Sequence, residues 1–303
     1  MGRGPQIREK AEELMSYLTF FLVLVAACLH ASWNFLAKRA GNSSGFIWLF
    51  NLLSTLFYTP ILCFVLITER PGLSWLQVIF LLGSACLHLA YFLFLQRGYA
   101  LGDLSLAYPL ARGTGPLLST ACAIVLLGER PSLGALCGAF LLIAGVLLLV
   151  GNPWRIFASS SDTRGVIILA FITGIFIAAY TIWDKEAVST FLISPLLLSE
   201  ASSILMTAML SPATLKNWSK VRETWQLHRW KALGVGLMSP LAYLLILSAL
   251  ISSPVSQVAP LRESSVLVGT FMGARFLSEK HGWSRLGAAA LILTGIILLS
   301  GII

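Results

Sequence analysis

About ten separate runs of apolar residues in this chain are each long enough to cross a lipid bilayer. About 20 residues of α-helix, rising about 1.5 Å per residue, cover the ~30 Å hydrocarbon core. The runs lie at roughly 16–37, 45–67, 74–96, 104–127, 132–151, 165–184, 192–211, 232–251, 256–277 and 284–302. A spanning backbone must satisfy its own hydrogen bonds, so each run is expected to be a helix.

The composition supports the same class of protein. Of the 303 residues, 57% are hydrophobic and 11% are charged, whereas soluble domains carry about 25% charged residues. A soluble core has no room for this much apolar surface. We therefore predict an all-α polytopic membrane protein with ten transmembrane helices.

The sequence repeats itself at a shift of 150 residues. Leu104–Pro131 and Pro254–Lys280 share one order of features, in which a proline and an arginine precede an apolar run and a charged stop. The matching pairs are Arg112 with Arg262, Glu129 with Glu279, Phe21 with Phe171, Trp33 with Trp183, and Asn34 with Asp184. The chain is therefore expected to consist of two equivalent halves.

Each half contains five predicted spans. Because five is odd, the second half must enter the membrane from the opposite side, which predicts a 5+5 inverted repeat. This architecture is typical of secondary transporters, whose binding site lies near the midplane between the repeats. The predicted parts are an extramembrane segment at 1–15, a first repeat at 16–151, a linker at 152–164 and a second repeat at 165–303.

The segments Leu126–Val150 and Phe276–Gly301, with Gly-Glu-Arg-Pro and Ser-Glu-Lys at their charged turns, resemble the EamA-type members of the drug/metabolite transporter superfamily. The resemblance covers nearly the whole chain after Ser16. It implies a transporter, in most members an exporter, of amino acids, nucleobases, drugs or other small metabolites. It also implies a bacterial inner membrane location with cytoplasmic termini, but it does not indicate the substrate.

The basic residues of the loops favour the opposite orientation. With a cytoplasmic N-terminus, more lysines and arginines would lie outside than inside, against the positive-inside rule. The orientation therefore stays open. Many of these residues lie in the longest predicted loop, at about 212–231, where they alternate with Trp218, Trp225 and Trp230. Such a segment is typical of an interfacial belt or an amphipathic stretch on the lipid head groups.

Arg112 and Arg262 are the strongest candidates for substrate binding. Ionisable groups inside spans are costly and are therefore functional candidates, and a planar guanidinium suits bidentate capture of a carboxylate or phosphate. The alternative is a structural role, with each arginine satisfied by a carbonyl, Glu263 or Glu200. Pro109 and Gly113–Pro116 in the first half, like Pro254 and Pro260 in the second, predict a broken helix beside each arginine.

Other polar and aromatic residues of the spans complete the predicted site. His30 and His88 are expected to bind substrate or relay protons, or to make single interhelical hydrogen bonds. Asn34 lies on the same helix face as His30. Aromatic rings are expected to line the cavity or to anchor helices at the membrane interface. The predicted substrate-binding residues are Arg262, Arg112, His88, Tyr91, Tyr243, His30, Asn34, Trp33 and Trp183.

Two further features are assigned from the same spans. Glu263 and Glu200 are carboxylates well inside spans, and they are the candidates for proton coupling, although Glu263 could instead stay paired with Arg262. Gly134 with Gly138, and Gly269 with Gly273, form small-residue faces that predict close helix packing.

The sequence contains no motif of an enzyme. There is no GxxxxGK[ST], HExxH or GxSxG motif and no Cys-His cluster, so no catalytic residues, metal or cofactor are predicted. No basic run suits nucleic acid. The predicted partners are a small-molecule substrate, the lipid bilayer and protons.

We therefore predict a secondary transporter that exports a small, polar, anionic metabolite by alternating access. Two alternatives remain. A lipid-linked-sugar flippase of the same fold would open laterally and move no water-soluble compound. A non-transporting membrane sensor or assembly protein would leave all fluxes unchanged when Arg262 is replaced.

Overall fold

The computed structural model describes residues 17–40, 44–69, 72–101, 104–150, 161–277 and 283–300. All the regular structure within these ranges is α-helical. The helices of the first half are α2 (Tyr17–Ala40), α3 (Ser44–Glu69), α4 (Trp75–Leu101), α5 (Leu104–Leu126) and α6 (Leu133–Val150). Those of the second half are α8 (Ser161–Ser189), α9 (Pro195–Leu215), α10 (Trp218–Ser252), α11 (Val255–Arg262), α12 (Ser264–Leu277) and α13 (Trp283–Ser300).

The helices fit a protein that crosses the membrane several times. Six of the described helices are long and apolar enough to span a bilayer, namely α2, α3, α4, α8, α9 and α10. Shorter apolar stretches lie within α5, α6 and α13. Large apolar side chains such as Phe64, Phe140 and Ile168 are exposed, while polar side chains such as Asp184 and Glu263 are buried. This distribution suits a lipid surround, because soluble proteins rarely expose such large apolar patches. The count of ten spans stays a prediction.

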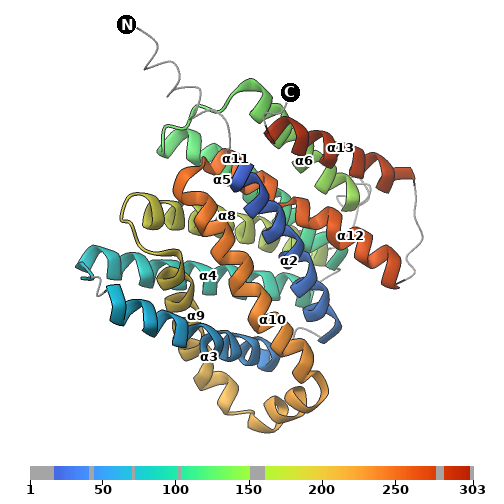
Figure 1. Cartoon of the computed structure of the whole chain (residues 1–303). Helices are drawn as coiled ribbons and strands as arrows, with labels where there is room; N and C mark the ends of the chain where they lie inside the picture. The colour runs from blue at the N-terminus through green and yellow to red at the C-terminus, as the bar shows by residue number, and fades with distance from the viewer. Residues whose placement is uncertain are drawn as a thin grey trace, which may run out of the picture.

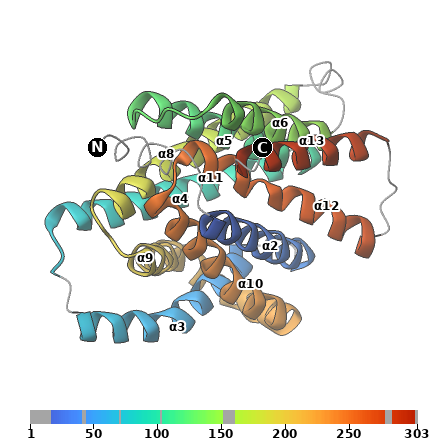
Figure 2. The same ribbon diagram turned by 45° about the horizontal axis from the view of Figure 1, so that its top comes forward.

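The two halves interlock around a shared centre. Helix α2 packs on α10 as α8 packs on α4, and α2 packs on α12 as α8 packs on α5. Equivalent helices also meet directly, as α6 with α13 along one edge and α3 with α9 at the opposite end (Figures 1 and 2). The helix pairing is therefore unchanged when the halves are exchanged, as two equivalent repeats require.

The predicted helix break appears in the second half but not in the first. Helices α11 and α12 are separated by the single residue Glu263. By contrast, α5 runs without interruption through Gly113 and Gly115. A Cβ atom on Gly113 would lie 2.6 Å from the Leu147 side chain, and one on Gly115 would lie 2.6 Å from Ile177. The prediction of a break at Gly113–Pro116 was wrong, because these glycines allow α6 and α8 to approach closely.

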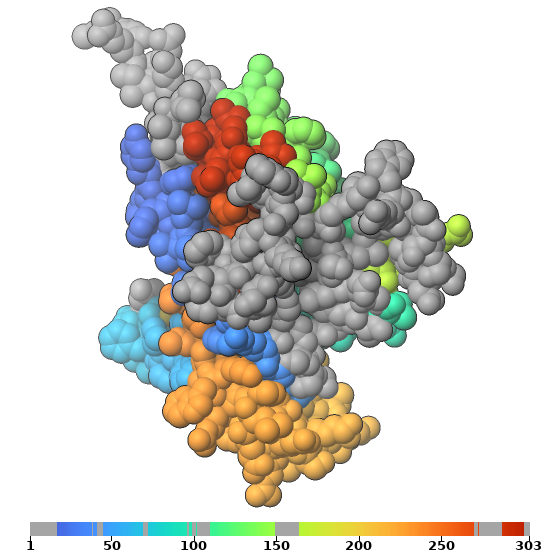
Figure 3. Space-filling model, turned by 90° about the vertical axis from the view of Figure 1, so that its right-hand side faces the viewer, coloured from blue at the N-terminus to red at the C-terminus, as the bar shows by residue number. Residues whose placement is uncertain are grey.

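The predicted loop at about 212–231 is mostly helical. Helix α9 continues to Leu215, and α10 already begins at Trp218 and runs to Ser252, with non-helical backbone angles at His228. This part of α10 and the end of α9 form one end of the molecule (Figure 3, orange). Val221 is buried there, while Trp218 and Trp230 are exposed. Packing of Val221 in the cluster that contains Phe46 and Trp48 explains why a helix forms here.

The predicted small-residue faces are only partly used. Helices α6 and α13 do approach closely, since a Cβ atom on Gly138 would lie 2.9 Å from the Gly295 carbonyl oxygen. Among the described side chains, however, only the Ser132 hydroxyl lies within 4 Å of such an atom on Gly134, and none lies within that distance of one on Gly269. Within the described part of the chain, those two glycines therefore make no close helix contact.

The turn between α10 and α11 is held from both sides. The Glu129 carboxylate accepts hydrogen bonds from the backbone amides of Val255 (2.7 Å) and Ser256 (2.9 Å) at the start of α11. The Lys185 Nζ donates to the carbonyl oxygens of Leu250 (2.7 Å) and Ser253 (3.2 Å) at the end of α10. Negative charge at a helix N-terminus and positive charge at a C-terminus are both stabilising. This arrangement fixes α11, which ends in Arg262.

Candidate functional site

The two arginines that the repeat pairs meet in the interior at one carboxylate. Arg112 comes from α5 and Arg262 from the end of α11, and they are 4% and 7% exposed. The Nε atom of Arg112 lies 2.9 Å from Oε2 of Glu263, and the Nε atom of Arg262 lies 3.6 Å from Oε1. Arg112 also donates to the Ser265 hydroxyl at 3.0 Å. Two buried cations thus share one fully buried anion.

Arg262 is incompletely satisfied. Within the described ranges, neither its Nε nor its Nη2 atom has a hydrogen-bond acceptor, although both atoms are buried. Its ion pair with Glu263 is long, at 3.6 Å. Buried polar groups are nearly always hydrogen-bonded, and a buried unpaired donor costs about 1–3 kcal/mol or more when charged. The guanidinium is therefore able to accept an anionic partner.

A second polar cluster surrounds Asp184 on α8. Its carboxylate accepts hydrogen bonds from the hydroxyls of Ser84 and Tyr243, each at 2.6 Å. The Nε2 atom of His88 lies 3.8 Å from the same carboxylate. These side chains come from α4, α8 and α10, so both halves contribute to the cluster. His88 and Tyr243 were predicted as site residues, and the structure brings them together.

Tyr180 connects the two clusters. Its ring stacks on His88 with a centroid distance of 4.1 Å, and the Arg262 guanidinium lies 6.0 Å from its centre. Tyr91 meets Tyr180 edge-on at 5.6 Å. Cation–π contact with a ring is favourable within about 6 Å. The aromatic group of Tyr180, Tyr91 and His88 thus lies on the side of Arg262, through the contact of Tyr180 with its guanidinium.

The other predicted residues of α2 lie around His30. Its ring meets Trp33 edge-on at 4.8 Å, and it is near enough to Arg112 and Arg262 to interact with their charges. The Asn34 amide donates to the His30 carbonyl oxygen at 2.7 Å, within its own helix. Trp33 packs against the core cluster that contains Phe46 and Trp48. Among the predicted residues of α2, His30 therefore lies within electrostatic range of both arginines.

Trp183 and Glu200 make their described contacts elsewhere. The Trp183 indole donates to the Phe80 carbonyl oxygen at 2.9 Å and packs on the Phe80 ring. Glu200 accepts a hydrogen bond from Thr59 of α3 at 2.9 Å. Both contacts join neighbouring helices, and neither involves the arginine cluster.

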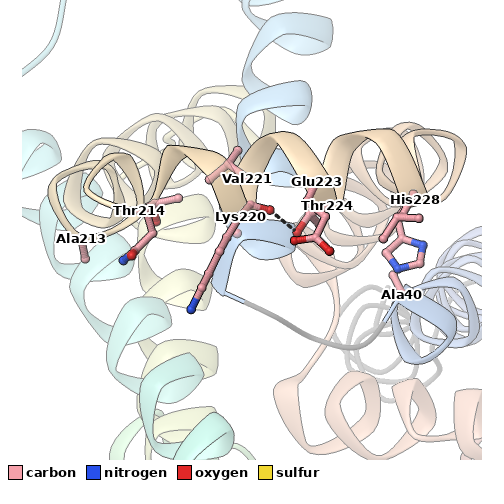
Figure 4. A pocket seen from close by; sticks show the side chains of 11 residues that line it. Ala40, Ala213, Thr214, Lys220, Val221, Glu223, Thr224 and His228 are labelled. Carbon is pink, nitrogen blue, oxygen red and sulfur yellow. Dashed lines mark hydrogen bonds between the residues drawn. The ribbon is translucent and has the colours of Figure 1, made fainter.

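A surface hollow of about 350 Å³ lies far along α10 from these clusters. Figure 4 shows its lining, which includes Lys220, Glu223 and His228 from the first part of α10, with Thr214 from α9 and Ala40 from α2. None of the predicted site residues lines it. The buried clusters, and not this hollow, form the candidate site.

Sequence reasoning noted Asp184 as an ionisable residue at the end of a span without giving it a role in the site, and it did not assign Tyr180, Ser84 or Ser265. The repeat contained a signal for two of them. At the shift of 150 residues, His30 corresponds to Tyr180 and Asn34 corresponds to Asp184. Since His30 and Asn34 were predicted as site residues, the repeat indicated their equivalents in the second half as further candidates. Ser84 and Ser265 had no such signal, because their roles depend on contacts between helices.

The chain's fold and interior define a polytopic membrane transporter built from two repeats. Comparison with protein families supports this class directly, since the model of the EamA-like transporter family matches residues 18–151 and 164–301. The chain belongs to this family, and the resemblance seen in its sequence is confirmed.

Solved structures share the fold. One, described only as "Crystal structure of protein", aligns with a TM-score of 0.71 and 16% sequence identity, over 92% of this chain and 95% of that chain. At this identity the likeness concerns the fold alone. No curated protein matches the sequence.

Proposed function

We propose that the protein is a secondary transporter that exports a small, polar, anionic metabolite across the bacterial inner membrane by alternating access. The observation that carries this proposal is the buried Arg262 guanidinium, whose Nε and Nη2 atoms find no acceptor in the described part of the chain. A carboxylate or phosphate oxygen would supply both acceptors with bidentate geometry.

The charges around the arginines favour an anion. Arg112 has its ion pair with Glu263 at 2.9 Å, whereas Arg262 shares that carboxylate at 3.6 Å. A single carboxylate cannot neutralise two guanidiniums, and an unpaired buried charge is costly. A bound anion would remove that cost. Tyr180, Tyr91 and His88 would then enclose the remainder of the substrate.

The break between α11 and α12 is where we expect the chain to bend during transport. The α11–α12 junction at Glu263 lies directly beside Arg262, so bending there would move the guanidinium. Equivalent helices of the two halves pack on each other, and rocking of one half against the other is the usual route of alternating access in such repeats.

The test compares metabolites inside and outside cells that overproduce the wild type, Arg262→Ala, Arg262→Lys or the control Arg222→Ala. Arg222 is an exposed arginine of α10, so its loss should leave export unchanged. We expect one class of anionic compound to appear outside with the wild type, to be lost with Arg262→Ala, and to be reduced with Arg262→Lys, which keeps the charge but lacks the planar fork.

Each contrary result has a definite meaning. Greater uptake from the medium would make the protein an importer. A cationic exported compound would contradict the role of Arg262. If no soluble compound changes but lipid-linked sugars redistribute between the leaflets, the protein is a flippase. If neither changes, a sensor or assembly role replaces transport.

A further inference from the structure

We infer that Asp184 and His88 together form a proton-binding site that is linked to the arginine cluster through Tyr180. Its use in coupled transport rests on the proposed function. The binding of the proton itself rests on the geometry of the Asp184 cluster alone.

The immediate surroundings of Asp184 leave its charge without a full counter-charge. The side chain is 1% exposed, and its two hydrogen-bond donors, Ser84 and Tyr243, are neutral hydroxyls at 2.6 Å. In the described ranges, the basic side chain within ion-pair distance is the His88 imidazole, at 3.8 Å, and it carries a charge only when protonated. A buried carboxylate without a cation is costly. One added proton on the carboxylate would offset that cost.

The orientation of the imidazole makes room for this proton. The Nδ1 atom of His88 lies 2.9 Å from the Ser84 carbonyl oxygen, which can only accept, so Nδ1 carries the hydrogen of the neutral ring. The Nε2 atom then has a lone pair and lies 3.8 Å from the carboxylate of Asp184. This distance is longer than a hydrogen bond, so the two acceptors repel, and a proton on the carboxylate would allow the side chains to close to hydrogen-bonding distance.

His88 is the less buried member of the pair, with a side chain that is 16% exposed, compared with 1% for Asp184. Histidine is well suited to pass a proton to a neighbouring group.

The two predicted proton sites fit this role less well. Glu263 lies between two guanidiniums, so protonating it would leave two buried cations without a counter-charge. Glu200 accepts from Thr59 on α3 and shares no described contact with the arginine cluster. The repeat adds a further contrast, because the equivalent of Asp184 in the first half is the neutral Asn34. The acid is thus specific to the second half.

The charged and titratable groups that face Asp184 come from several helices. They are His88 on α4, Tyr243 on α10 and Arg262 at the end of α11, with Tyr180 on its own helix. Lys185 points away, to the carbonyl oxygens of Leu250 and Ser253. From α9 the neutral Ser202 approaches Ser84 at 3.4 Å, and Arg112 of α5 is paired with Glu263.

Tyr180 lies between the Asp184–His88 pair and Arg262, and it links proton binding to anion binding. The ring contacts both His88 and Arg262, and Arg262 lies within electrostatic reach of Asp184. A proton changes the Asp184–His88 pair from negative to neutral and so raises the positive potential at Arg262. Binding of the proton should therefore favour binding of the anion.

The test is pH-difference infrared spectroscopy of the purified full-length protein in nanodiscs of phosphatidylethanolamine and phosphatidylglycerol. Acidification of the wild type should convert a buried carboxylate to a carboxyl, seen as a new C=O band. Asp184→Asn, which places in the second half the residue found at the equivalent position of the first, should remove that band. Glu200→Gln, which removes another buried carboxyl, should keep it.

Two further variants test the pairing and the link. His88→Gln should shift the midpoint of the band, because it removes the Nε2 atom that lies 3.8 Å from the carboxylate. Arg262→Ala should also shift the midpoint, whereas the exposed control Arg222→Ala should not. If Asp184→Asn fails to fold, as judged by size-exclusion chromatography, Tyr243→Phe removes a donor to the same carboxylate and should alter the position of the band.

The outcomes separate the two proposals. A wild type without a pH-dependent band, or a band that survives in Asp184→Asn, overturns the proton site. An unshifted midpoint in Arg262→Ala overturns the link to the arginine cluster. Neither result depends on transport. The export assay can fail while the carboxyl band remains, and export can persist while the band is absent.

Discussion

Glu129 holds the N-terminus of α11, and we predict that Glu129→Ala loosens the helix that carries Arg262. The helix has Pro254 at its N-cap position and no side-chain cap of its own. Its first amides, those of Val255 and Ser256, donate to Glu129 at 2.7 and 2.9 Å. A hydrogen bond to a charged group contributes about 1.5–3 kcal/mol, and a lost N-cap costs about 0.5–2 kcal/mol. Because Glu129 is partly exposed, water compensates in part, and we expect a loss of about 2–3 kcal/mol.

Thermal unfolding of the purified protein in nanodiscs measures this loss. At about 2–4 °C per kcal/mol for chains of 150–250 residues, the unfolding midpoint should fall by about 4–12 °C. The midpoint of Glu129→Gln, which keeps an acceptor but not the charge, should fall by less. The control is Arg130→Ala, because Arg130 is the exposed neighbour on the same turn. A Glu129→Ala midpoint equal to that of the wild type would refute the capping role.

Four other substitutions test the packing and the buried charges. Gly295→Ala should destabilise the protein by about 1–3 kcal/mol, because its Cβ would lie 2.6 Å from the Gly138 carbonyl oxygen. Gly269→Ala, which has no described side chain within 4 Å, should be neutral or slightly stabilising in the same melting assay. Glu263→Gln should cost about 3–5 kcal/mol, since it leaves two buried guanidiniums without their carboxylate; a melting temperature equal to that of the wild type would contradict the described ion pairs. Lys185→Met should lower the melting temperature by a few degrees, at about 2–4 °C per kcal/mol. The reason is that the carbonyl oxygens of Leu250 and Ser253 lose their donor. An unchanged melting temperature would exclude a stabilising role of Lys185 at the end of α10.

The class of the protein and its division into halves follow from local patterns. Apolar runs of about 20 residues require helices in a membrane, because the backbone there has no other hydrogen-bond partner. The shift of 150 residues pairs Arg112 with Arg262 through the order of amino acids alone. Both features can be read from the order of residues in the chain, and the family match and the helix pairing agree with them.

Local patterns are less informative about helix boundaries. Gly113–Pro116 resembles a helix break, yet α5 is continuous there, because Leu147 and Ile177 occupy the space beside its glycines. The stretch at 212–231 resembles a polar loop, yet it is mostly helix, because Val221 packs against the start of α3. Packing partners far along the chain decide both segments.

The sequence by itself determined that this chain is a membrane protein of two matching halves with an arginine at the same place in each. Only the tertiary structure decided which groups those arginines meet. Arg112 of the first half reaches Glu263 of the second, and Asp184 finds its hydrogen-bond donors on α4 and α10. Contacts of this kind depend on how helices from different halves pack together, and no local periodicity encodes that packing.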